Sequence, residues 1–136
     1  MATETTASTV ESSATEETSI GPDGNVVGAL AYVLAPLSGV LVYLLEDENQ
    51  FARFHAAQSI AFGVGAIVLW IGLVLVTGIL AVIPVIGTIF GLISLVAYPI
   101  LSLALLIGWV FLIVKAYQGE ATVLPILGPI AEENLL

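Results

Sequence analysis

The chain has 136 residues, of which 59% are hydrophobic and 10% charged, and its formal net charge is -9. This balance is too apolar for a soluble domain of this length and predicts a single integral membrane domain. With 11 acidic residues against two basic ones, a basic surface is excluded, so neither nucleic acid nor an anionic lipid surface is an expected partner.

Residues 1–25 predict a disordered acidic tail. They hold several acids, no base and many Ser and Thr, with too few apolar side chains to offset the entropy of ordering. The tail lacks the basic start and apolar stretch of a secretory signal, so the first hydrophobic segment is expected to remain as an anchor. A Gly-Pro-Asp-Gly sequence at 21–24 marks the boundary.

The first hydrophobic segment, residues 26–45, is long enough to cross the roughly 30 Å of a hydrocarbon core once. Pro36 lies near its middle and predicts a kink, because proline removes a backbone donor. A polar turn follows at 46–50, where Asp47 or Asn49 is expected to cap a helix that begins around Phe51.

The following stretch, Ala56 to Val114, contains no Asp, Glu, Lys, Arg or His. Its best breaking point is Ile83–Gly87, which predicts helices over about 51–83 and 87–118. Dividing this uncharged stretch into three spans would leave almost nothing for turns, so two spans are expected within it. A break at Tyr98–Pro99 would instead make residues 88–97 a re-entrant or interfacial piece. The expected fold is an all-α integral membrane protein with a three-helix transmembrane bundle over 26–120 and a short cytoplasmic segment at 121–136.

An even number of crossings between Arg53 and Lys115 places the two basic residues on one side, and the positive-inside tendency assigns that side to the cytoplasm. In a plasma membrane the N-terminal tail is then expected outside, with residues 46–55 and the C-terminus inside.

Small residues recur at helical spacing on each predicted span, and small residues let membrane helices approach closely. The first two small faces are therefore expected to pack together, with the leucines of the first span (Leu30, Leu34, Leu37, Leu41, Leu44) mostly opposite. The predicted packing residues are Gly28, Ala31, Ala35, Gly39, Ala57, Ala61, Gly65, Gly87 and Gly91.

Polar residues concentrate where the second span begins, and the candidate site there consists of Arg53, His55, Gln58 and Ser59. One interpretation is a polar entrance or interaction motif; the other, favoured here, is an interfacial anchor whose members satisfy each other and the preceding turn, with His55 bonded to Glu46 or Glu48. A Ser59–His55 catalytic pair is disfavoured because nothing supplies an oxyanion hole, so no catalytic residue and no enzyme activity are expected.

At the membrane boundaries, Lys115, Tyr117 and Tyr43 suit interfacial anchors, whereas Trp70 and Trp109 fall inside spans and suit packing. The chain has no cysteine and one histidine, so no metal site or cofactor is expected. The acidic composition also favours a halophilic prokaryote as the source.

Several motifs occur in order along residues 28–133: Leu-Ala-Tyr at 30–32, Arg-Phe-His-Ala-Ala-Gln-Ser at 53–59, Lys-Ala-Tyr-Gln-Gly-Glu at 115–120 and Leu-Pro-Ile at 124–126. Together they resemble an uncharacterised family of small prokaryotic membrane proteins, itself similar to the twenty-kilodalton subunit of the chloroplast inner-envelope import machinery. The resemblance implies an all-helical membrane domain with the Arg-Phe-His loop and the C-terminus on the cytoplasmic side. The further helix of the chloroplast proteins cannot be supplied by residues 1–25.

These observations favour a non-enzymatic small subunit or scaffold of a membrane assembly, related to protein translocation if the resemblance extends that far. Its expected partners are the lipid bilayer and a membrane protein or further copies of itself. The alternative is a homo-oligomeric channel or carrier for a small solute or ion, because three short helices enclose no pore alone.

Overall fold

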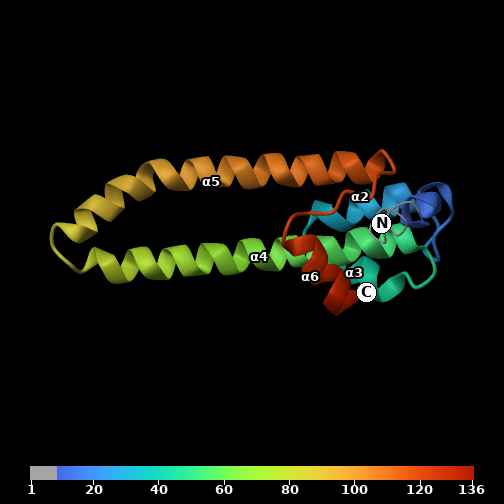
Figure 1. The fold of residues 1–136 in the computed structure, drawn as a ribbon, viewed down its shortest axis with the longest axis horizontal. Coiled ribbons are helices and arrows are strands. Elements are labelled where there is room, and N and C mark those ends of the chain that lie inside the picture. Colours follow the sequence, from blue (N-terminus) through green and yellow to red (C-terminus); the bar gives the residue numbers. More distant parts are fainter. Residues whose placement is uncertain (1–8) are drawn as a thin grey trace. The chain divides into compact units, whose positions relative to one another are not determined.

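A computed structural model shows an all-helical chain and describes residues 9–136. Residues 9–12 are helical and lead into the 3-10 turn η1 (Ser13–Thr15). The remaining elements are labelled in Figure 1: α2 (Gly24–Val33), α3 (Leu37–Leu45), α4 (Gln50–Ala81), α5 (Ile86–Tyr117) and α6 (Leu127–Leu135). The predicted all-α class is confirmed.

The chain divides into two compact units, which we describe separately. The smaller one, Gly65–Gly108, is a helical hairpin made of the end of α4 and the beginning of α5. Its turn includes Val85 at a φ of 69° and is closed by a 2.8 Å hydrogen bond from the Gly87 N–H to the Ile83 carbonyl. A Cβ on Gly87 would lie 2.7 Å from the Ala81 carbonyl oxygen, so only glycine fits this turn without a shift.

A small group of polar contacts joins the two helices of this hairpin. The Tyr98 hydroxyl donates to the Leu73 carbonyl at 3.1 Å and bonds the Thr77 hydroxyl at 2.5 Å, while the Tyr98 ring meets Trp70 edge-on at 5.2 Å between centroids. Since the tyrosine proton points to the Leu73 carbonyl, Thr77 is the donor of the second bond. Polar groups that would be costly in lipid thus satisfy each other inside the hairpin.

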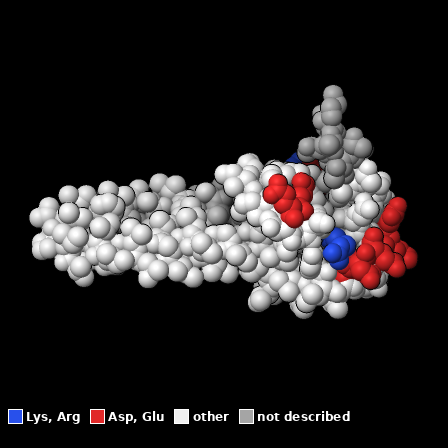
Figure 2. Space-filling view, turned by 60° about the horizontal axis from the view of Figure 1, so that its bottom comes forward, with Lys and Arg blue, Asp and Glu red and all other residues white. Residues whose placement is uncertain are grey.

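Two helices are long and apolar enough to cross a membrane, α4 and α5, each of 32 residues. At ~1.5 Å per residue each is about 48 Å long, more than the roughly 30 Å that a span requires. The predicted break at Ile83–Gly87 is confirmed to within a few residues. Helix α5 continues through Pro99, so the alternative break at Tyr98–Pro99, with residues 88–97 as a separate piece, is wrong. Figure 2 shows the acidic side chains in red and the basic ones in blue, with the other described residues in white.

The prediction of three spans is wrong, because residues 26–45 do not form one helix. The chain leaves the helical path at Leu34–Pro36, and α2 and α3 have only 10 and 9 residues, about 15 Å each. Val27 near the start of α2 and Val42 near the end of α3 belong to one buried cluster, so the two helices run antiparallel. The predicted effect of Pro36 was therefore too small: instead of a kink in one span there is a helical hairpin.

The predicted disorder of residues 1–25 is not confirmed for the part that the structure describes; residues 1–8 lie outside it. Val10 and Ala14 are buried in a cluster with Phe51, Phe54 and Ala121. Backbone carbonyls of Ser13 and Glu16 accept hydrogen bonds from the Asn49 amide at 2.8 and 3.1 Å. Composition alone did not indicate these long-range partners.

The predicted placement of the N-terminal tail across the membrane from residues 46–55 is also wrong. The Ser19 N–H and hydroxyl donate to the Glu46 carboxylate at 2.7 and 2.8 Å, and the Ala121 N–H donates to Glu11 at 2.9 Å. Groups in direct hydrogen-bond contact lie on the same side of a bilayer. Residues 9–24, the 46–49 loop and the segment after α5 therefore share one side.

Candidate interaction site at the start of the second long helix

The Arg-Phe-His-Ala-Ala-Gln-Ser motif lies in the first turns of α4, which Asn49 fixes in place. The Asn49 Oδ1 accepts a hydrogen bond from the Ala52 N–H at 3.0 Å, as an N-cap residue does. The sequence prediction that Asp47 or Asn49 caps this helix is thus confirmed for Asn49. Since the same amide holds the N-terminal segment, one side chain sets both the start of α4 and the position of residues 13–16.

His55 is fully buried and bonded through both ring nitrogens, to α2 on one side and to the chain after α5 on the other. Its Nε2 lies 3.0 Å from the Glu120 carbonyl oxygen and its Nδ1 lies 2.7 Å from the Tyr32 hydroxyl. A carbonyl only accepts, so Nε2 carries the proton, and the neutral ring then accepts the Tyr32 proton at Nδ1. The prediction that His55 bonds Glu46 or Glu48 is wrong.

Gln58 lies one turn after His55 and continues the same network. Its Nε2 donates to the Tyr32 hydroxyl at 3.0 Å and to the Thr122 carbonyl at 2.7 Å, and its Oε1 accepts from the Leu124 N–H at 2.8 Å. Three of its four hydrogen-bonding positions are therefore filled by the protein itself. Together His55 and Gln58 bind the backbone of residues 120–124, which we call the C-terminal strap.

Ser59 points to the break between α2 and α3. Its hydroxyl donates to the Ala31 carbonyl at 2.5 Å, and that carbonyl also accepts from the Ser38 hydroxyl at 2.7 Å. The Trp109 indole donates to the neighbouring Tyr32 carbonyl at 2.6 Å. Because the Ser59 proton goes to a backbone carbonyl and both nitrogens of His55 are occupied, the two side chains do not form a nucleophile–base pair.

Arg53 turns away from this network toward the loop before α4. Its guanidinium donates to the backbone carbonyls of Tyr43 and Glu46 at 3.2 and 2.6 Å and lies 4.7 Å from the centre of the Tyr43 ring. Cation–π contact and carbonyl bonds together fix the end of α3 against the start of α4. The structure therefore brings His55, Gln58 and Ser59 together with Tyr32 and Ala31, and leaves Arg53 with separate partners.

Glu46 is a buried carboxylate whose negative charge is held by hydrogen bonds. Its oxygens accept from the N–H groups of Glu48 and Asn49 at 2.9 and 2.7 Å, besides both donors of Ser19. Burial by itself would raise the pKa of Glu46, but the bonds from the backbone of Asn49 and from Ser19 and Glu48 hold that pKa below its ordinary value. The Glu46 carboxylate thus stabilises the loop that precedes the motif.

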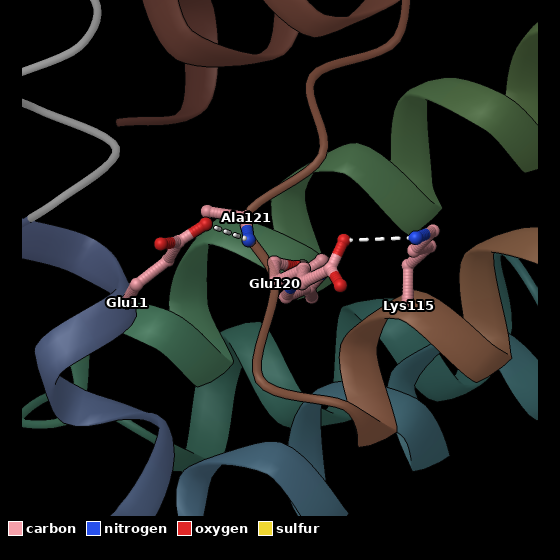
Figure 3. Close-up of polar contacts among 5 residues, drawn as sticks. Glu11, Lys115, Glu120 and Ala121 are labelled. Carbon is pink, nitrogen blue, oxygen red and sulfur yellow. Dashed lines mark hydrogen bonds and ion pairs between the residues drawn. The ribbon is translucent and has the colours of Figure 1, made fainter.

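Two further contacts hold the C-terminal strap in place (Figure 3). Lys115, in the last turn of α5, pairs with the Glu120 carboxylate at 2.9 Å, and Glu11 accepts from the Ala121 N–H at 2.9 Å. The Lys115–Glu120 pair is partly exposed and worth little by itself. The strap is held mainly by backbone hydrogen bonds to Glu11, His55 and Gln58. Within residues 9–136 every buried side-chain nitrogen or oxygen has a hydrogen-bond partner.

The predicted small faces meet in part. A Cβ on Gly28 would lie 3.1 Å from the Phe51 ring and one on Gly39 would lie 2.6 Å from the Ser59 hydroxyl, so α2 and α3 pack closely on α4 at these points. Gly63, which the prediction omitted, lies against Pro36. Ala31 and Ala57 are buried, Ala35, Ala61, Gly65 and Gly87 are partly exposed, and a Cβ on Gly91 would meet nothing.

The boundary residues have mixed surroundings. Tyr117 is exposed, whereas the half-buried Tyr43 donates its hydroxyl to the Leu135 carbonyl in α6 at 2.5 Å. An anchoring role for Lys115 and Tyr117 stays a prediction. Sequence reasoning missed Tyr32 and Trp109 as members of the site, and it named Glu46 only as a partner of His55. The only signal for Tyr32 was its place in the first motif of the family resemblance.

An apolar hairpin with two candidate membrane spans, and a larger unit closed by buried polar contacts, are typical of a small helical membrane protein. The chain belongs to the MamF/MmsF family, described as the magnetosome magnetite crystal formation protein family, whose model matches residues 23–131. The predicted membership of a small prokaryotic membrane-protein family is thereby confirmed.

Named relatives come from archaea. A UPF0132 membrane protein of Methanocaldococcus jannaschii is 40% identical over 117 residues, which are 86% of this chain and 93% of the relative. One from Archaeoglobus fulgidus is 40% identical over 111 residues, 82% of this chain and 94% of the relative. No solved structure matches the chain. Similarity to the chloroplast import subunit and a halophilic source stay predictions.

Proposed function

We propose that this protein is a non-enzymatic structural subunit or scaffold of a membrane assembly, in which a lipid-embedded hairpin carries a closed polar end. The observation that carries the proposal is the closure of the network around His55 and Gln58. Both ring nitrogens of His55 and three of the four hydrogen-bonding positions of Gln58 are filled by groups of α2 and the C-terminal strap, so the motif serves to fix these two segments on α4. A site for a solute would instead hold polar groups open for its ligand.

The surface of the two long helices supports the same role. Most of the large apolar side chains on both helices between Gly65 and Gly108 are exposed, which suits contact with acyl chains or with other membrane helices. With Arg53 and Lys115 in the same unit, the positive-inside tendency assigns the polar end, including the C-terminus, to the cytoplasmic side of a plasma membrane.

Other roles receive less support from these contacts. A homo-oligomeric channel would need Arg53, His55, Gln58 and Ser59 to line an entrance, yet all four bond to their own chain. A role in protein translocation rests on the chloroplast resemblance alone and stays a prediction. The crystal formation in the family's description is said of that family, and the role proposed for this chain is a structural one in the membrane.

The test is to purify the tagged protein from its native membranes in mild detergent and identify stoichiometric partners by mass spectrometry. The wild type and Gln50→Leu, which changes an exposed glutamine on the same helix, are expected to retain the same membrane-protein partner or further copies of the chain. Gln58→Leu should insert into membranes but lose that partner. Ion or solute flux through vesicles containing this protein alone would overturn the scaffold proposal in favour of a channel.

A further inference from the structure

The hairpin of α2 and α3 is too short to cross a bilayer and begins and ends with polar residues at the same end. Asp23 precedes α2, and Glu46 follows α3 directly. Because α2 and α3 run antiparallel, with Val27 packed near Val42, these two polar ends lie together. The chain therefore returns to the side from which it started.

The outer surface of this hairpin is apolar, whereas its inner surface consists of small residues that pack on α4. Leu34 and Leu37, at the tip, are 68% and 70% exposed, the former at the end of α2 and the latter at the start of α3. The other large apolar side chains exposed on the hairpin are Leu30, Val33, Val40, Leu41, Leu44 and Leu45. So many exposed apolar side chains on one short hairpin mark an interaction surface.

The tip of the hairpin has its broken backbone satisfied by side chains. The Leu34 N–H donates to the Ser38 hydroxyl at 3.0 Å, Ser38 and Ser59 both donate to the Ala31 carbonyl, and Trp109 donates to the Tyr32 carbonyl. In a loop exposed to water, solvent can satisfy such groups. Satisfaction by four protein contacts is what a tip surrounded by hydrocarbon requires.

The depth of the tip follows from its neighbour on α4. A Cβ on Gly63 would lie 2.5 Å from the Pro36 nitrogen, so the tip is level with Gly63. Gly63 is about 20 Å along the helix from the cap at Asn49. A bilayer with its headgroups is roughly 40–45 Å thick, so a hairpin that starts at the headgroups reaches about its midplane.

We propose that the hairpin of α2 and α3 is a re-entrant wedge whose partner is the acyl chains of a single leaflet, the one on the side of Arg53 and Lys115. A wedge of this kind enlarges one leaflet only, so the protein favours membranes that are convex toward that side. This inference concerns the lipid contact of the hairpin and is independent of the assembly role proposed above.

The depth test uses single cysteines, since the chain has none of its own. A fluorophore on Leu34→Cys should be quenched by lipids brominated on their acyl chains, whereas the free thiol should resist a membrane-impermeant maleimide added to either face. Val76→Cys, which lies on a spanning helix with its side chain exposed to lipid, is the matched lipid-facing control, and Asn134→Cys is the water-facing one. Reaction of Leu34→Cys from the side of Asn134 would place the tip in water, and reaction from the opposite side would make the hairpin a span. Protection without quenching by bromine would show that protein covers the tip. Each of these three results overturns the proposal.

The curvature test uses tubes pulled from giant vesicles that contain Asn134→Cys protein. An impermeant dye added outside labels only molecules whose C-terminal side faces outward, and these should be enriched in the tube relative to the flat membrane. Adding Leu34→Ala, Leu37→Ala and Leu41→Ala should abolish the enrichment by trimming the wedge. Adding Val76→Ala, Leu92→Ala and Leu95→Ala trims similarly exposed side chains from the spanning helices and should preserve it. Equal enrichment of both triple variants, or none with the parent, would contradict the leaflet wedge; circular dichroism checks that each variant is folded.

Discussion

Replacing Gln58 with leucine should release the C-terminal strap while leaving the long helices intact. The change removes the two bonds donated by its Nε2 to Tyr32 and Thr122 and the bond accepted from Leu124. Only the bonds to Thr122 and Leu124 hold the strap, since Tyr32 belongs to α2. At about 1 kcal/mol net for each hydrogen bond, the loss for the strap is about 2 kcal/mol, or roughly a thirtyfold change in its opening equilibrium. Leucine is close to glutamine in size, so the packing around it changes little.

The assay is cleavage after Glu120 by a Glu-specific protease, followed by mass spectrometry in detergent. When opening and closing are fast relative to cleavage, the rate follows the population of the open strap, so Gln58→Leu should be cut roughly thirtyfold faster than wild type. Gln50→Leu makes the same chemical change at an exposed site on α4 and controls for the loss of an amide. If Gln58→Leu were cut no faster than Gln50→Leu, the network would not hold the strap and the structural interpretation of the motif would be refuted.

Three further predictions address the loop, the packing and the hairpin. The pKa of Glu46 is lower in the folded protein than in the unfolded chain, so its contribution to stability is complete above the ordinary glutamate pKa of about 4.3 and is lost as the pH falls below that value. Thermal unfolding measured from pH 6 to pH 3 should show this loss. Glu46→Gln should make the melting temperature depend less on pH. Gly63→Ala should lower the free energy of unfolding by about 1–3 kcal/mol, because the added Cβ clashes with Pro36. Gly72→Ala on the same helix, where a Cβ meets nothing, should leave the free energy of unfolding unchanged or raise it by up to ~1 kcal/mol. Equal melting temperatures for these two variants would contradict the packing of Gly63 against Pro36. Tyr98→Phe removes two hydrogen bonds and, at about 0.6 kcal/mol for each bond within a membrane, should destabilise the Gly65–Gly108 unit by only about 1.2 kcal/mol. A melting temperature many degrees lower would show that these two bonds stabilise the hairpin more than expected.

The long helices could be predicted from sequence because their signals are local. Lack of charge from Ala56 to Val114 requires lipid, and the Pro-Val-Ile-Gly turn at 84–87 is the one place where both proline and a tight glycine break the run. The capping role of Asn49 and the exposed leucine face of the first segment are equally local. Each of these depends on spacing within a few residues.

The first segment misled the prediction because hydropathy and length do not separate one span from two half-length helices. What decides is the contact of Pro36 with Gly63 and the capping of Ala31 by Ser59, both between parts of the chain that the sequence does not bring together. Residues 9–24 also depend on a distant partner: their polar composition is typical of disorder, but two of their backbone carbonyls accept hydrogen bonds from Asn49. Tyr32 could not be recognised as the partner of His55, because a tyrosine in an apolar segment is ordinarily a packing residue.

The network around His55 and Gln58 also orders events during biosynthesis. Both side chains leave the ribosome well before their partners in the C-terminal strap, and α4 and α5 lie between them in the sequence. The first unit, which is built from the two ends of the chain, therefore cannot close its hydrogen bonds until both long helices have been synthesised and have returned the chain to the starting side. The hydrogen bonds between α4 and the strap therefore form only after both long helices are in place, and a molecule with a misplaced long helix is left with the polar groups of His55 and Gln58 unpaired, which is costly in an apolar surrounding.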